Sequence, residues 1–363
     1  MLIEHERLER NIDRMQTAAT ARGLRLRPHA KTHKSPELAR VQIGRGAVGI
    51  CCAKLGEAEV FAHAGIEDIR LPYPLNPVNA DRVLNLLDST RLSFIVDDAA
   101  VAKGWSDALR AAGVSVDVLV KVDVGFHRCG IDPEAAGAAK LVARVAEMPG
   151  LRFRGLLSHA GHAYHASSDA ETEAIAASEA RLLNDLAARV RDLGVPVEEI
   201  SVGSTPTARF SLQQKGLTEL RPGNYIYYDR TQVALGAATY DDCALTVLAR
   251  VVSRPAADRV ILDSGSKTLA LDQARGASEM RGHGAVFESL DTSVPDRSLV
   301  IERLSEEHAT VRVDGETSLA TGDLVRILPN HACVVSNLVD GVWLVNGRQV
   351  EERIEIAARG RIA

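Results

Sequence analysis

The chain has 363 residues, of which 46% are hydrophobic and 25% charged, and its formal net charge is −5. This composition is ordinary for a globular protein, and the mild charge argues against nucleic acid or an anionic membrane as a partner. No apolar run reaches the roughly 18 residues that a membrane-spanning helix needs, and the N-terminus lacks the layout of a secretory signal. Five scattered cysteines without a CxxC pair favour reduced thiols, so we expect a cytoplasmic protein. The length of the chain suggests two domains.

In the first two-thirds of the chain, short apolar segments alternate with alanine- and leucine-rich segments of helical periodicity. Runs such as VDVLVKV are typical of parallel strands that are buried on both faces. Eight strands separated by helices predict an α/β fold, a (β/α)8 TIM barrel that spans residues 5–234. The expected strands are 24–30, 47–53, 68–72, 92–96, 116–122, 153–158, 199–202 and 219–225.

After about Ala234 the helical segments give way to strand-like ones that are separated by turns with Gly and Asp. Examples are HATVRVDG and GVWLVNGRQVEERIEI. We therefore expect a second, mainly β domain over residues 235–363. The opening MLIE, residues 1–4, is a candidate strand that joins this domain.

Polar side chains gather where the barrel strands are expected to end. RPHAKTHK follows the first strand, and a lysine among cations suits a Schiff-base nucleophile, although such a charge run is more often a solvated loop. Strands five to eight end in VKVDVGFHRCG, LLSHAGHAYH, SVGSTPT and LRPGNYIYYD. The last two carry the hydroxyls and small residues that suit a phosphate. Because the active site of a barrel enzyme lies at this end, the four segments should meet RPHAKTHK there.

These motifs, followed by PNHACVVSNL, resemble in content and order those of the D-threonine aldolase and D-serine dehydratase family. This family belongs to the alanine racemase-like class of pyridoxal 5'-phosphate (PLP) enzymes, and the resemblance covers nearly the whole chain. It implies that PLP is held by Lys31 as a Schiff base, with Lys34 the weaker candidate. It also implies a divalent metal and a homodimer.

The resemblance assigns roles to further residues around the cofactor. Arg128 matches an arginine near the phenolic oxygen, and His159 matches a ring that packs against the pyridine face. Arg221 matches an arginine on the pyridine nitrogen, which cannot stabilise a proton there and so weakens the electron sink. The expected phosphate cradle consists of Ser204, Thr205, Gly223 and Asn224.

The NHAC segment of the β domain offers a metal site. If it is a strand, His331 and Cys333 lie two residues apart and point to the same face. An isolated HxC pattern is usually coincidence, but the resemblance implies metal ligands at this spacing, with positions left open for water and a substrate hydroxyl. Cysteine favours zinc by its softness, with manganese and magnesium as alternatives.

The remaining expectations concern residues near the substrate. Lys31 and His331 are the candidate catalytic residues, and Tyr164 and His162 are candidate substrate contacts. Asp123 is expected to orient Lys121 or Arg128.

The leading hypothesis is a PLP- and metal-dependent lyase that cleaves D-β-hydroxy-α-amino acids to glycine and an aldehyde. The alternative is a dehydratase of D-serine or 3-hydroxyaspartate, in which Lys31 removes the Cα proton and the hydroxyl leaves. A PLP-binding homeostasis protein without catalysis resembles the barrel alone, so the β domain with NHAC argues against it. An alanine racemase needs a second acid–base residue, usually a tyrosine of the β domain, and Tyr240 does not stand in the context of that motif.

Overall fold

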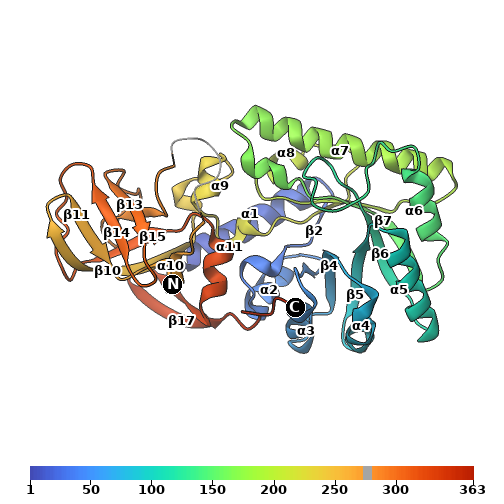
Figure 1. Ribbon diagram of the computed structural model, residues 1–363, viewed down its shortest axis with the longest axis horizontal. Helices are drawn as coiled ribbons and strands as arrows, with labels where there is room; N and C mark the ends of the chain where they lie inside the picture. Colours follow the sequence, from blue (N-terminus) through green and yellow to red (C-terminus); the bar gives the residue numbers. More distant parts are fainter. Residues whose placement is uncertain (273–279) are drawn as a thin grey trace.

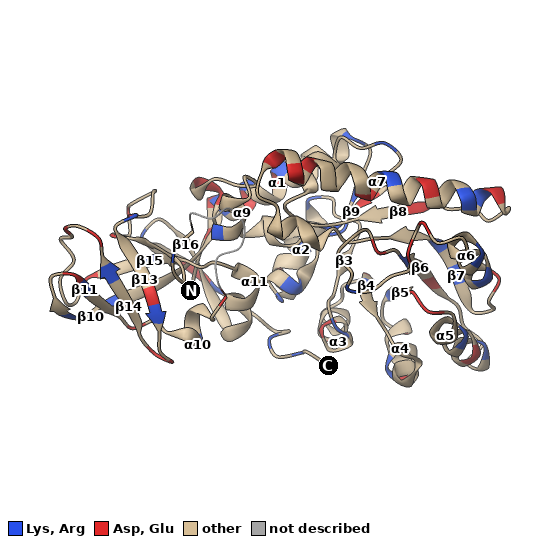
Figure 2. Ribbon diagram, turned by 45° about the horizontal axis from the view of Figure 1, so that its top comes forward, with Lys and Arg blue, Asp and Glu red and all other residues tan. Residues whose placement is uncertain are grey.

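The structure is a computed structural model that describes residues 1–272 and 280–363. Two units lie side by side in Figure 1, a barrel with surrounding helices and a β domain, and α1 (His5–Ala21) lies where they meet. Both acidic and basic residues lie along α7 (Asp169–Asp192), with only acidic ones up to Glu179 (Figure 2). Within the described ranges, no helix is both long and apolar enough to cross a membrane.

The first unit is a parallel eight-stranded barrel, as predicted. Its sheet has the order β2-β9-β8-β7-β6-β5-β4-β3. A parallel bridge between His29 and Cys51 and the hydrogen bond from the Val48 amide to the Leu26 carbonyl (2.9 Å) join its two edges. The strands are β2 (Arg25–Leu26), β3 (Ile50–Cys51), β4 (Asp68–Pro74), β5 (Arg91–Val96), β6 (Val116–Lys121), β7 (Leu151–Leu157), β8 (Glu199–Val202) and β9 (Glu219–Leu220).

Helices follow the barrel strands and cover the outside of the sheet, as Figure 1 shows. Local sequence explains where several begin, since Asp98 and Ser168 accept backbone N–H groups as N-caps of α5 and α7. The helices are α2 (Pro36–Gly44), α3 (Leu55–His63), α4 (Ala80–Leu87), α5 (Ala99–Ala111), α6 (Ala138–Ala146), α7, α8 (Ala208–Ser211) and α9 (Arg230–Ala234).

The first and last barrel strands are shorter than the sequence predicts. Instead of continuing to residues 30 and 225, β2 and β9 end at Leu26 and Leu220. The reason is a proline in each segment, Pro28 and Pro222, which has no N–H to donate to the ladder. Two short 3₁₀ turns follow, η1 (Ala30–Thr32) and η4 (Asn224–Ile226), so the polar residues of both motifs lie in turns above the barrel.

The second unit is an antiparallel β barrel with an extension. Strands β10 to β15 close on themselves because β11 pairs with both β14 and β10. The N-terminal strand β1 (Leu2–Glu4) lies between β10, to which it is antiparallel, and β16, to which it is parallel. The strands are β10 (Leu245–Ala256), β11 (Arg259–Leu262), β12 (Ala285–Phe287), β13 (Leu299–Leu304), β14 (Ala309–Val313), β15 (Leu324–Leu328), β16 (Gly341–Asn346) and β17 (Gln349–Glu355), with the short helices α10 (Ser266–Leu269) and α11 (Ala332–Val335).

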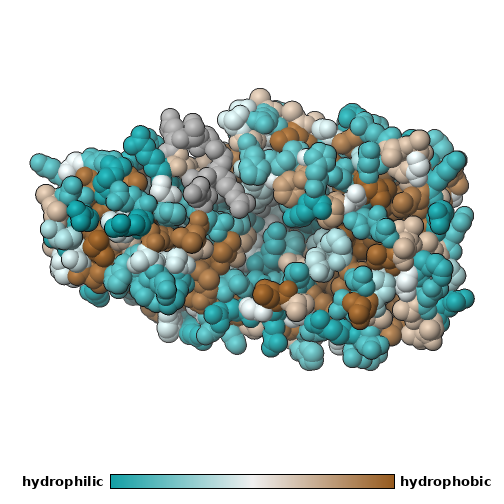
Figure 3. Space-filling view, viewed as in Figure 1, coloured by the Kyte–Doolittle hydropathy of each residue, from teal (hydrophilic) through white to brown (hydrophobic). Residues whose placement is uncertain are grey.

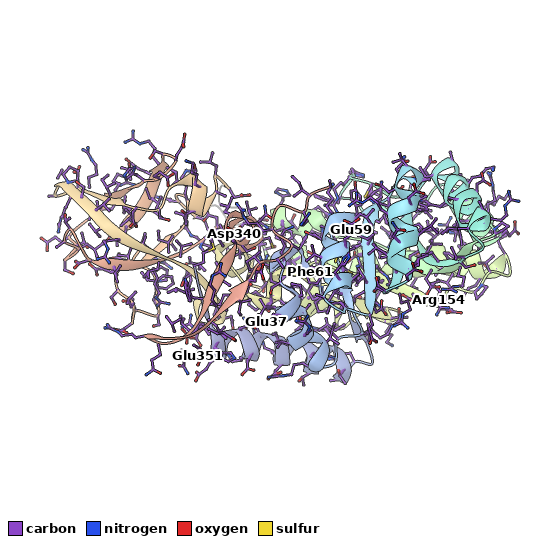
Figure 4. The ribbon with its side chains drawn as sticks, turned by 90° about the horizontal axis from the view of Figure 1, so that it is seen from below. Glu37, Glu59, Phe61, Arg154, Asp340 and Glu351 are labelled. Atoms are coloured by element: carbon purple, nitrogen blue, oxygen red, sulfur yellow. The ribbon has the colours of Figure 1, made fainter. Side chains whose placement is uncertain are left out.

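The two units share a hydrophobic junction. Leu8, Ile12 and Tyr227 from the barrel side belong to the same buried cluster as Leu245 and Val342 of the β domain. From below, Figure 4 shows Glu59 and Phe61 on the barrel side of this junction, with Asp340 and Glu351 on the other. On the face shown in Figure 3, hydrophobic residues form only small patches among hydrophilic ones. Burial of the hydrophobic side chains that the two units share at the junction fixes the β domain against the C-terminal end of the barrel.

Candidate active site

A cavity of about 190 Å³ lies where the C-terminal ends of the barrel strands meet the β domain. This volume holds a small organic ligand rather than a single water, which needs only roughly 10–15 Å³. Its wall brings together nearly all of the residues that the sequence singled out: Lys31, Arg128, His159, Tyr164, Ser204, Thr205, Arg221, Gly223, Asn224, His331 and Cys333.

Lys31 lies in η1 beside two histidines that are held neutral. The backbone N–H of Lys31 donates to Nδ1 of His29 (3.4 Å). Burial, and next the charge of Lys31, lower the pKa of both His29 and His159 well below their usual value. The ring of His159 is also held edge-on by Phe126, with ring centroids 5.9 Å apart. The lysine amine therefore has uncharged aromatic neighbours against which a planar cofactor ring can pack.

The loops after β8 and β9 form a polar concavity. The Ser204 hydroxyl is buried and has no protein partner within the described part of the chain, while Thr205 Oγ1 accepts the Asn224 backbone N–H (3.1 Å). A Cβ on Gly203 would lie 2.8 Å from the Cβ of Arg221, and one on Gly223 would lie 3.0 Å from the His29 carbonyl oxygen. The glycines thus let the loops approach each other, and the unpaired hydroxyl fits an oxygen of a bound phosphate.

Arg221 is held on the floor of the cavity by a buried network. Its Nη1 donates to Ser201 Oγ (2.5 Å), which in turn donates to Glu219 Oε1 (2.6 Å). Glu219 is fully buried and also pairs with Arg27 (2.9 Å) and Arg70 (2.6 Å). Although burial alone would raise its pKa, Arg70 and Arg27 lower the pKa of Glu219 to about 2. The carboxylate therefore stays charged and fixes the guanidinium that faces the cavity.

The expectation that the NHAC segment is a strand is wrong. His331 is the N-cap of α11, because Asp229 Oδ2 accepts the Ala332 backbone N–H (2.9 Å) and the next residues turn into a helix. The two side chains still face each other, and Cys333 Sγ lies 3.1 Å from Thr32 Oγ1.

Burial opposes charge on both His331 and Cys333, but their mutual attraction outweighs it. As a result the pKa of Cys333 is lowered, while that of His331 is raised well above its usual value. Outside residues 273–279, no group of three or more His, Cys, Asp and Glu is arranged to hold a metal. An imidazole and a thiolate that share one cavity wall suit a metal with two protein ligands and open positions.

His162 and Asp123 occupy different places from those that their candidate roles suggest. His162 is not part of the cavity wall and lies 3.6 Å from the position of a Cβ on Gly125. Asp123 accepts hydrogen bonds from the Gly125 and His127 amides (both 3.0 Å) and from the His127 ring, so it orients neither Lys121 nor Arg128. Arg128 lines the cavity and also lies over the ring of Phe126, 5.1 Å from its centroid.

Tyr164 and Tyr240 differ in their distance from the candidate metal ligands. The Tyr164 ring is edge-on to that of His331, with centroids 6.3 Å apart. Tyr240 lies in η5 (Tyr240–Asp242), edge-on to Phe287 and away from the cavity wall. Tyr164 is therefore placed to contact a ligand, whereas Tyr240 lies outside the wall of this cavity.

Lys121 and Asp229 were missed by the sequence reasoning. Lys121 ends β6, lines the cavity and is 3% exposed, and burial, then Arg221, lower its pKa to about 7. Its position as the polar end of the apolar run VDVLVK was the available signal. Asp229 ends the motif LRPGNYIYYD, but nothing in the pattern indicated its contact with His331, 102 residues away.

Comparisons with known proteins agree along the whole chain. Residues 3–231 match the family model "Alanine racemase, N-terminal domain", and residues 244–345 match "Putative serine dehydratase domain". A D-threonine aldolase from Arthrobacter sp. is 35% identical over 97% of this chain and 90% of its own. A D-threo-3-hydroxyaspartate dehydratase from Delftia sp. (strain HT23) is 34% identical over 92% of this chain and 90% of its own.

Solved structures give the same picture. The crystal structure of a D-threonine aldolase from Filomicrobium marinum has a TM-score of 0.90 and 31% identity, over 100% of this chain and 95% of that one. A cysteine-to-alanine mutant of a D-threo-3-hydroxyaspartate dehydratase, in its metal-free form, has a TM-score of 0.90 and 30% identity, over 98% and 96%. Alanine racemase from Clostridium difficile 630, with a TM-score of 0.70 and 13% identity, shares the fold.

Proposed function

Because the chain belongs to the lyase family of D-threonine aldolases and D-serine dehydratases, within the alanine racemase-like class, we propose that it is a PLP- and metal-dependent D-threonine aldolase. The observation that carries this proposal is a single cavity that Lys31 shares with His331 and Cys333. A lysine that binds the cofactor and a pair of metal ligands thus face the same substrate. A PLP-binding protein without catalysis has no use for this second group.

The two bound groups supply chemistry that side chains lack. PLP takes up the electrons of a broken bond to Cα, and a divalent metal acidifies a hydroxyl. The residues of the chain bind and orient these groups. Lys31 holds the cofactor, Ser204 and Thr205 bind its phosphate, and Arg221 donates to its ring nitrogen without protonating it. His331 and Cys333 hold the metal, for which zinc is the expected ion.

In the proposed reaction the Cα–Cβ bond of a D-β-hydroxy-α-amino acid breaks. The β-hydroxyl loses its proton and becomes the carbonyl of the aldehyde, while Cα gains a proton and leaves as glycine. Tyr164 lies beside His331 and would contact the substrate next to the hydroxyl. Burial of the surrounding loops limits the access of water to the reacting atoms.

Dehydration of D-serine or 3-hydroxyaspartate is the second candidate. The metal-free mutant of the D-threo-3-hydroxyaspartate dehydratase has an alanine in place of a cysteine. A second mutant of that enzyme replaces the histidine two positions before this cysteine. This spacing equals that of His331 and Cys333. In this reaction Lys31 Nζ takes the Cα proton, and the hydroxyl leaves as water.

The products separate the two reactions. The zinc-loaded holoenzyme is incubated with D-threonine, D-serine and D-threo-3-hydroxyaspartate, and glycine, aldehyde, 2-oxo acid and ammonia are measured. Glycine and acetaldehyde from D-threonine are expected. A 2-oxo acid and ammonia without glycine would establish the dehydratase and overturn the aldolase. The Lys31→Ala variant serves as the control and should lose both turnover and the cofactor's visible absorbance.

We further propose a homodimer, which the family resemblance implies, and a cytoplasmic location. Sedimentation of the purified holoenzyme at micromolar concentration tests the first, and a species of one 39.0 kDa chain would contradict it.

A further inference from the structure

We propose that Asp229 is a positioning residue that presents His331 to a divalent metal and sets the place of Cys333. This inference rests on the proposed function, because it takes these two side chains as metal ligands. Asp229 lies on the barrel side of the junction as the last residue of the motif LRPGNYIYYD, and its side chain is fully buried. A buried carboxylate is costly unless its oxygens are paired, so its partners indicate what it does.

One oxygen of Asp229 has an ordinary structural task. Oδ1 accepts the backbone N–H of Gln232 (3.0 Å) and caps the N-terminus of α9. A cap of this kind is worth about 1 kcal/mol and needs a single oxygen. Tyr228, the preceding residue, has a φ of +49°, in the left-handed region that non-glycine residues seldom adopt. The backbone is thus held in an unfavourable conformation directly before Asp229, which capping alone does not require.

The second oxygen points across the junction and accepts from three groups. Oδ2 lies 2.6 Å from Asn224 Nδ2, 2.9 Å from the Ala332 backbone nitrogen and 3.1 Å from Nδ1 of His331. The first two are N–H groups that can only donate, so Oδ2 is an acceptor. The imidazole Nδ1 must therefore carry the proton that faces Asp229.

This arrangement determines which ring nitrogen is free. With the proton on Nδ1, the lone pair that can bind a metal is on Nε2. Histidine ligands commonly donate their other N–H to a carboxylate in this way, which fixes both the tautomer and the ring orientation. The bond to the Ala332 N–H also holds the first turn of α11, and Cys333 is the next residue in that turn. One carboxylate thus fixes both candidate ligands.

The cost of losing this carboxylate should appear in metal affinity. Substitution of such outer partners weakens metal binding by about 10–100-fold. The test uses the Asp229→Asn variant of the PLP-loaded protein, and the dissociation constant for Zn²⁺ is measured by competition with a chromogenic chelator. We expect a 10–100-fold increase, with PLP still bound. Asp98→Asn is the matched control, since Asp98 caps α5 with bonds of 2.8 and 2.9 Å and is not part of the cavity wall, and it should leave the Zn²⁺ affinity unchanged.

A double-mutant cycle separates positioning from a general loss of structure. In a His331→Ala background, Asp229→Asn should weaken the remaining Zn²⁺ affinity by a smaller factor than in the wild type, because one of the two ligands that it fixes is gone and only its effect on Cys333 is left. Equal losses in both backgrounds would overturn the inference, as would an unchanged affinity in the single variant.

A spectroscopic measurement on the unmodified protein covers the case in which the variant fails to fold. The ¹⁵N resonances of the Zn²⁺-loaded protein, with labelled histidine, should show His331 protonated at Nδ1 and metal-bound at Nε2. Binding through Nδ1 would overturn the inference.

If Zn²⁺ binds as described but D-threonine and D-serine are not turned over, the proposed function fails and the inference stands. If wild-type protein and His331→Ala bind Zn²⁺ equally, the metal site and the inference fail together.

Discussion

Substitution of Glu219 by glutamine tests the buried network under the cavity. The change keeps the shape of the side chain but removes a charge that pairs with Arg27 and Arg70. Each arginine keeps a second acidic partner, Asp68 for Arg27 (2.5 Å) and Glu199 for Arg70 (2.9 Å), so the barrel should still fold. We expect the variant to be less stable and to hold Arg221 less firmly.

The size of the effect follows from the pKa of the carboxyl group. A fall from the usual 4.5 to about 2 corresponds to roughly 3 kcal/mol, at about 1.36 kcal/mol per pKa unit. Removal of one partner of a buried ion pair typically costs about 3–5 kcal/mol, which agrees. Because the pKa is depressed in the folded state, Glu219 contributes its full stability above pH 4.5. This contribution is lost as the pH falls from 4.5 towards 2.

Urea unfolding at pH 7 and along a series towards pH 3 provides the assay. Glu219→Gln should lower the free energy of unfolding by about 3 kcal/mol at pH 7, and its stability should fall less steeply below pH 4.5 than that of the wild type. Glu198→Gln is the control, because Glu198 is 52% exposed beside Arg154 and should change stability by less than about 1 kcal/mol. A loss below 1 kcal/mol for Glu219→Gln, or an unchanged pH dependence, would refute the reasoning.

Three further predictions concern the cavity itself. Ser204→Ala should weaken PLP binding about tenfold with little change in thermal stability, because the hydroxyl has no partner to lose among the residues that the structure describes. Equal PLP titrations of variant and wild type would contradict this. Gly203→Ala should reduce cofactor content by more than tenfold, since its Cβ would lie 2.8 Å from that of Arg221, and full cofactor absorbance would rule out the tight approach. Cys333→Ser should lower Zn²⁺ content and turnover together while PLP remains bound, as metal analysis and absorbance can measure; full metal content would exclude Cys333 as a ligand.

The alternation of apolar segments and helical periodicity was sufficient to predict the barrel, because each parallel strand must be buried on both faces. Strand ends were less predictable. The strands β2 and β9 end before Pro28 and Pro222, and the polar motifs continue as 3₁₀ turns. The facing of His331 and Cys333 was predicted from a strand, whereas in the structure His331 is the extended N-cap residue and Cys333 lies in the helical turn that follows.

Contacts between distant parts of the chain were beyond the reach of the sequence. The hydroxyl of Thr32 meets the Cys333 thiol 301 residues later, and Asp229 meets His331 across the junction of the two units. Spacing within a motif reports which side chains share a local face. It carries no information on which face of another domain will pack against them, since this depends on the tertiary fold.

The position of β1 has a consequence for the order in which the protein is made. This strand contains Leu2–Glu4, yet it lies between β10 and β16. The residues of β16 are among the last to be synthesised. The barrel segments can begin to associate while the chain is still growing, as N-terminal units generally do. The extension of the β domain, however, cannot form until β1 is joined by residues beyond 340. Because His331 and Cys333 lie near the end of the 363-residue chain, the nascent chain gains these proposed metal ligands only when translation is almost complete.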